Sequence, residues 1–93
     1  GANIMMGIRL TVNQADIDNG VRGDIFHCPI AKSIWRAHPK VDSVAVTTVF
    51  VSIVEGEAVH RYQLSPRAAQ FILSVDGGLA VQPSTFKLQE LTS

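Results

Sequence analysis

Apolar positions recur along the chain with a spacing that changes from segment to segment, and each spacing predicts an element. In residues 7–12 every second position is apolar, which is typical of a strand with one buried face. A short helix is expected over residues 14–19, because Asn13 is a capping residue and Asp16 stands in the first turn. Gly20 is expected to end this helix with a positive φ angle. The chain therefore begins with a strand and a short helix.

Two further helices are expected to begin at prolines. Pro29 and Pro66 each precede an apolar stripe of helical spacing, and proline suits the first helical position because its φ is fixed and it has no N–H to leave unpaired. The first of these helices should end near Ala37, ahead of Pro39. The second should end at Gly77-Gly78.

The remaining apolar segments are rich in β-branched residues, which favours strands. Residues 44–54 predict one long strand, and residues 58–64 predict its hairpin partner after a turn at 55–57. A last extended segment is expected over residues 81–91, where Pro83 favours a sheet edge or an irregular lead-in. The expected order is β, α, α, β, β, α, β. This order predicts an α+β fold with a small, mainly antiparallel sheet and helices on one face.

Length and composition limit the organisation of the chain. Its 93 residues, 46% of them hydrophobic, are expected to form a single domain over residues 5–93. Residues 1–4 have the character of a cloning remnant ahead of a native start. The longest apolar run has 11 residues and is too short to span a membrane. Cys28 has no partner for an intramolecular disulfide, which favours a reducing, cytoplasmic location.

The expected long strand is apolar on both faces, whereas the three helices can cover only one. The uncovered face predicts a homo-oligomer, most simply a dimer. The alternative is that residues 86–91 fold across this face within one chain. The expected interface residues are Val49, Val51 and Ile53, or their alternates Val46 and Phe50 on the other face.

The charge balance bears on the class of partner. Eight basic residues oppose eight acidic ones, so no net field gathers phosphates and a dedicated nucleic-acid binder is not expected. Lys32, Trp35 and Arg36 nevertheless form a small basic and aromatic cluster on the second helix, a candidate binding site for a phosphate or an acidic partner. The alternative is an ordinary solvated helix face. If the cluster is a partner surface, Arg36→Glu is expected to abolish binding and to shift the melting temperature by no more than a few degrees.

Cys28 is the candidate nucleophile, because helix N-terminal amides stabilise a thiolate and His27 is adjacent. The alternative, which we favour, is a small buried hydrophobic residue. Asp24, His38 and His60 add potential metal ligands, but none of the recurrent zinc spacings is present. We therefore expect no catalytic residue, no metal and no cofactor.

Several short motifs are spread over most of residues 8–88: Thr11-Val12, Asp16-Ile17, Gly20, Cys28-Pro29-Ile30-Ala31, Leu64-Ser65-Pro66, Phe71-Ile72, Asp76-Gly77-Gly78, Val81, Pro83, Phe86 and Leu88. Together they resemble a group of small proteins encoded by bacteriophages and prophages. The resemblance implies no established activity and assigns no functional residue.

The resemblance implies an accessory protein made in the cytoplasm of an infected bacterium. Viral proteins of this size often act in host takeover by binding, either blocking a host or defence protein or sequestering a small nucleotide signal. We therefore expect a non-enzymatic binding protein. The alternatives are a nucleic-acid-associated regulatory protein that uses Lys32, Trp35 and Arg36, and an enzyme that depends on Cys28.

Overall fold

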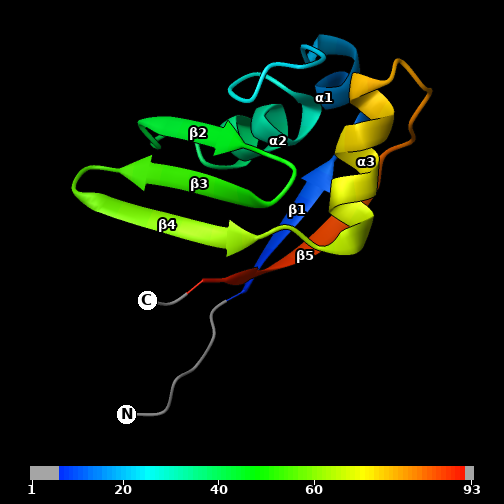
Figure 1. Ribbon diagram of the computed structural model, residues 1–93. Coiled ribbons are helices and arrows are strands. Elements are labelled where there is room, and N and C mark those ends of the chain that lie inside the picture. The colour runs from blue at the N-terminus through cyan, green and yellow to red at the C-terminus, as the bar shows by residue number, and fades with distance from the viewer. Residues whose placement is uncertain (1–6, 92–93) are drawn as a thin grey trace.

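The computed structural model describes residues 7–91 and confirms the expected α+β class (Figure 1). The expected cloning remnant at residues 1–4 lies outside the described residues. The order of elements contains one strand more than the sequence predicts. The elements are β1 (Gly7–Val12), α1 (Gln14–Asn19), α2 (Pro29–Ala37), β2 (Ser43–Val46), β3 (Phe50–Glu55), β4 (Ala58–Gln63), α3 (Pro66–Asp76) and β5 (Ser84–Glu90).

Local capping signals place the helices where the sequence predicts them. At α1, the Asn13 side chain accepts a hydrogen bond from the Asp16 backbone N–H, and the Asp16 carboxylate accepts one from the Asn13 N–H, each at 2.9 Å. The helices α2 and α3 begin at Pro29 and Pro66. The prediction for Gly20 is wrong, because its φ is −70°. Glycine is needed there because a Cβ would lie 2.6 Å from the ring of Pro29.

The expected single strand over residues 44–54 is also wrong, because the chain turns at Thr47. The Thr47 hydroxyl oxygen accepts hydrogen bonds from the N–H groups of Val49 and Phe50, at 3.1 and 3.0 Å. The Thr47 N–H in turn donates to the Phe50 carbonyl at 2.9 Å. A threonine side chain thus replaces the glycine or proline that usually marks a turn. The segment forms the β2–β3 hairpin.

All neighbouring strands are antiparallel, in the order β1-β5-β4-β3-β2. Six residue pairs join β1 to β5 and six join β3 to β4, but only Tyr62–Glu90 and Gln63–Gln89 join β4 to β5. The sheet therefore curls at this seam, and β1 and β5 cross the direction of the other three strands (Figure 1). Beyond the seam, one edge of β5 runs without a paired strand.

One hydrophobic core joins the inner face of the sheet to the helices. Its fully buried side chains include Ile30 and Ile34 of α2, and Phe71 of α3 packs edge-on against Phe86 of β5 with ring centroids 5.4 Å apart. The outward positions of β1 and β5 are polar or exposed. The helices are therefore packed on one face of the sheet, as the sequence predicts.

The expected oligomer interface does not lie on an open face. Val51 and Ile53 are buried in the core of a single chain, opposite Val46 and Val44 of β2. The turn at Thr47 changes the phase of the alternation, so valines on both sides of it point inward. Val49 is 66% exposed, but it lies in the turn. The prediction that Val51 and Ile53 are open to water is wrong.

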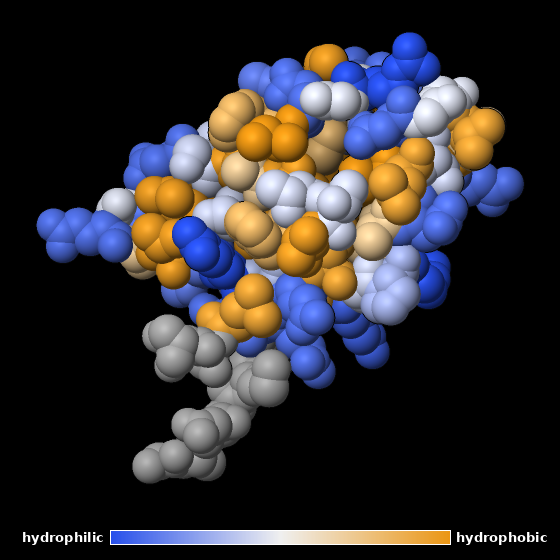
Figure 2. Space-filling model, viewed as in Figure 1, coloured by the Kyte–Doolittle hydropathy of each residue, from blue (hydrophilic) through white to orange (hydrophobic). Residues whose placement is uncertain are grey.

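The outer face of β2–β4 is less apolar than one continuous strand implies. Phe50 and Val54 are half-buried there, and the Arg61 guanidinium carbon lies 5.4 Å from the centre of the Phe50 ring. Figure 2 shows apolar side chains over this side of the molecule, interrupted by polar ones. Among the described residues, no helix is long and apolar enough to cross a membrane.

Candidate functional site

The cluster predicted on α2 contains a structural ion pair. The Arg36 guanidinium donates hydrogen bonds to both carboxylate oxygens of Asp16, at 2.9 and 3.2 Å, and to the Thr11 carbonyl at 2.7 Å. The hydrogen bond with Asp16 raises the pKa of Arg36 above its ordinary value. Trp35 packs against the core and Lys32 is half-buried. The three residues lie on one helix. The hydrogen bonds of Arg36, however, connect α2 to α1 and β1.

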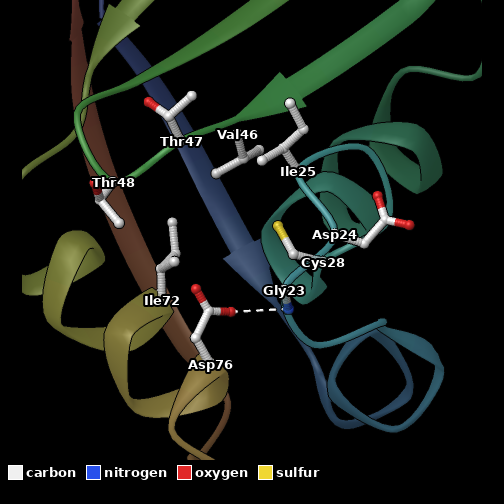
Figure 3. A pocket seen from close by; sticks show the side chains of 9 residues that line it. All are labelled: Gly23, Asp24, Ile25, Cys28, Val46, Thr47, Thr48, Ile72 and Asp76. Carbon is white, nitrogen blue, oxygen red and sulfur yellow. Dashed lines mark hydrogen bonds between the residues drawn. The ribbon is translucent and has the colours of Figure 1, made fainter.

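Cys28 is buried at the start of α2 beside a cavity of about 60 Å³ (Figure 3). Desolvation raises the pKa of its thiol, and this outweighs the hydrogen bonds from the Ala31 and Ile30 amides that lower it. The ring of His27 is bonded to the Asp24 carboxylate at 3.1 Å. The volume of this cavity is well below the roughly 300–1,000 Å³ of typical small-ligand pockets. These features support the buried, structural role for Cys28.

Alkylation kinetics test the state of this thiol. At pH 8 we expect iodoacetamide to label Cys28 at least about tenfold more slowly in the folded protein than in urea, because burial hinders access and disfavours the thiolate. Mass spectrometry after timed quenching measures both rates. Folding raises the pKa of the Cys28 thiol, so the protonated thiol favours the folded state. This contribution to the free energy of unfolding is fully present below the pKa of the unfolded chain, and it is lost as the pH rises through the pKa of the folded protein. Equal labelling rates in the two states would restore Cys28 as a candidate nucleophile.

Within residues 7–91 no three histidine, cysteine, aspartate or glutamate side chains gather as a metal site. His60 instead contacts Glu90 across the β4–β5 seam, with 2.9 Å between the Nδ1 and Oε1 atoms.

A basic groove that the sequence analysis missed lies between β5 and the first turn of α3. It has a volume of about 400 Å³, within the range of small-ligand and peptide sites. Arg9, Lys87 and Arg67 reach it from β1, β5 and α3. The other lining residues are Ser65, Pro66, Thr85 and Phe86.

The electrostatics of this groove are one-sided. Arg9 and Lys87 are directly opposed cross-strand neighbours, an arrangement that is unfavourable for like charges. Arg67 adds a third positive charge, with its guanidinium carbon 5.5 Å from the centre of the Phe86 ring. Among the described residues, none of the groove's lining residues is acidic, and none of these three cations forms a salt bridge. The positive end of the α3 dipole reinforces their field.

The sequence holds part of the signal for this groove. Arg9 and Lys87 each lie between two apolar positions of a strand, which places them on the solvent face. Their proximity depends on the pairing of β1 with β5, which no local pattern indicates.

The fold and this groove define a small α+β protein with a basic site at the edge of its sheet. No protein-family model matches the chain, and no match is found among the curated proteins or the solved structures.

Proposed function

We propose that the chain is a non-enzymatic binding protein whose basic groove receives a negatively charged part of its partner. The observation that carries the proposal is the convergence of Arg9, Lys87 and Arg67 on one groove without an acidic lining residue. A sequence selected for stability alone tends to place a carboxylate among such charges. Local conflicts of this kind are typical of binding sites.

The composition of the groove lining favours binding rather than chemistry. Of the described residues that line it, none is a histidine, cysteine, aspartate or glutamate. The Ser65 hydroxyl is the cap of α3 and accepts a hydrogen bond from the Ala68 N–H at 3.2 Å. The lining therefore supplies no imidazole, thiol or carboxylate to act as a base beside the Ser65 hydroxyl.

The resemblance to phage proteins gives the proposal a biological setting. A protein that blocks a host or defence protein meets an acidic surface, and one that sequesters a nucleotide meets a phosphate. Both ligands fit a basic groove. The alternative use of Lys32, Trp35 and Arg36 by a nucleic acid is less favoured, because Arg36 already neutralises Asp16. Self-association through Val51 and Ile53 is not part of the proposal, because both residues belong to the core.

The variant Lys87→Glu tests the proposal through two opposite effects. It places a carboxylate opposite Arg9 and so converts a like-charged pair into an oppositely charged one. We therefore expect the free energy of unfolding to rise by up to about 1 kcal/mol. The same change should weaken anion binding at least about tenfold. Urea denaturation measures the first effect. Titration of the ¹⁵N-labelled protein with inorganic pyrophosphate and a glutamate-rich peptide, at low and high salt, measures the second.

The control is Lys40→Glu, which makes the same charge change at an exposed position outside the groove. It should leave the shifts of the groove amides on titration unchanged. The proposal fails if neither probe shifts the amide signals of Arg9, Arg67 and Lys87, or if Lys40→Glu weakens binding as much as Lys87→Glu does.

A further inference from the structure

The inference concerns the edge of β5 that faces the groove. On one side β5 pairs with β1 from Ser84 to Gln89, but on the other it meets β4 only at Gln89 and Glu90. Between residues 84 and 88, the edge opposite β1 has no paired strand within residues 7–91. This stretch forms one wall of the basic groove, and Ser65, Pro66 and Arg67 form the other.

Backbone groups of the odd-numbered β5 residues point to this edge. The Leu91 N–H donates to the Arg61 carbonyl of β4 at 2.7 Å, and the Thr85 carbonyl accepts a long 3.4 Å hydrogen bond from Arg67 Nη1. In an antiparallel ladder, the N–H and C=O groups of residues two apart point the same way. The N–H and C=O of Lys87 therefore face the groove with those of Thr85. A strand placed there finds both donors and acceptors.

We infer that the groove binds an extended acidic segment of a partner protein, which adds to β5 as an extra strand. The inference rests on the proposed function and specifies its ligand. The backbone of the segment pairs with Thr85 and Lys87, and its carboxylates meet Arg9, Lys87 and Arg67. Side chains of a strand alternate between faces, so the segment that fits best has an acidic residue at every second position.

The groove suits such a segment better than it suits a nucleotide. The ring of Phe86, the only aromatic side chain among the described lining residues, is 2% exposed beneath Arg67 and offers no face for stacking a base. The free edge instead offers carbonyl acceptors beside its N–H donors, and a peptide backbone pairs with both, whereas an ionised phosphate pairs only with the donors. Positive charges along the edge also discourage pairing with a second copy of this chain. The acidic strand is the occupant that uses both the edge and the charges.

The test compares three probes by titration of the ¹⁵N-labelled protein. The first is a six-residue peptide of alternating glutamate and threonine, and the second is the same peptide with N-methyl groups on all of its internal amides, so that no internal donor can pair with β5 in either strand orientation. The third is inorganic pyrophosphate. N-methylation keeps the charge but removes backbone donors. We expect the first peptide to shift the Thr85 and Lys87 amides and to slow their hydrogen exchange, and the second to bind at least about tenfold more weakly.

Thr85→Pro provides a matched test on the protein. It removes an edge N–H that makes no bond to β1, leaves the charge unchanged, and places proline where edge strands tolerate it. We expect it to weaken peptide binding while pyrophosphate still shifts the groove amides. Thr85→Ala removes the same side chain but keeps the N–H, so it should bind the peptide more tightly than Thr85→Pro does. Far-UV circular dichroism establishes that both variants are folded.

The outcomes separate this inference from the proposed function. Equal binding of both peptides, or no effect of a folded Thr85→Pro variant, overturns strand addition and leaves an anion groove. Binding of pyrophosphate but of neither peptide likewise overturns strand addition and leaves an anion groove. Failure of all three probes overturns the inference and the proposed function together.

Discussion

Val51→Lys should unfold the chain at room temperature, whereas Val49→Lys should leave it folded. Val51 is 0% exposed in the core, and a lysine there buries an unpaired charge. The expected loss is more than about 4 kcal/mol, a large part of the stability of a small domain. Val49 lies exposed in the turn before β3, so the same substitution should change the free energy of unfolding by less than about 0.5 kcal/mol. Circular dichroism during urea denaturation measures both.

The same pair of variants tests the interface predicted from the sequence. If Val51 lies between two chains, Val51→Lys gives a folded monomer where the original chain is a dimer. Light scattering of the two proteins at micromolar concentration distinguishes dissociation from unfolding. A folded, monomeric Val51→Lys variant would contradict the structure's placement of Val51 in the core.

Asp16→Ala should be the most damaging change at a charged position. The Asp16 carboxylate is buried and accepts hydrogen bonds from the Asn13 N–H and from two nitrogens of Arg36. Its removal takes away half of the capping box and leaves Arg36 without its partner. We expect the free energy of unfolding to fall by about 2–3 kcal/mol. Thermal and urea denaturation measure the change.

Two further variants, one at Asp18 of the same helix and one at the partner residue Arg36, provide the controls for this prediction. Asp18→Ala changes an exposed carboxylate of the same helix that bonds only to the Gln14 side chain, so a change below about 0.5 kcal/mol is expected. Arg36→Glu places a second carboxylate against Asp16 and should lower the melting temperature clearly. The sequence alone predicts only a few degrees for this change. Equal stability of Asp16→Ala and Asp18→Ala would show that the ion pair contributes nothing.

Local signals explain the parts of the fold that the sequence predicts well. Asn13 and Asp16 lie three residues apart and cap α1 by themselves, and Pro29 and Pro66 fix helix starts within one residue. The turn at Glu55-Gly56-Glu57 is equally local, since Gly56 adopts a φ of +59°. These features need no tertiary contact, so a single sequence reveals them.

The missed features depend on context. Thr47 lies in a run of β-branched residues, and only its side-chain bonds to Val49 and Phe50 make the turn. After this turn, the alternation of inward and outward side chains shifts by one position. The sequence pattern therefore does not show that Val51 is buried. The ion pair of Arg36 and the basic groove were missed for a related reason, because Arg36 meets Asp16 across 20 positions and Arg9 meets Lys87 across 78. Such long-range pairs decide which charges are free, and periodicity cannot identify them.

The pairing of β1 with β5 joins the two ends of the described chain (Figure 1), and this has a consequence for the order of folding. Strands β2, β3 and β4 are consecutive and connected by short turns, so they can assemble from local contacts. Closing β1 onto β5 costs much more loop entropy and is expected to come late. Arg9 and Lys87 become neighbours only at that step. The groove therefore exists only in the completed fold, and any partner that binds it stabilises the closed chain over its partly folded forms.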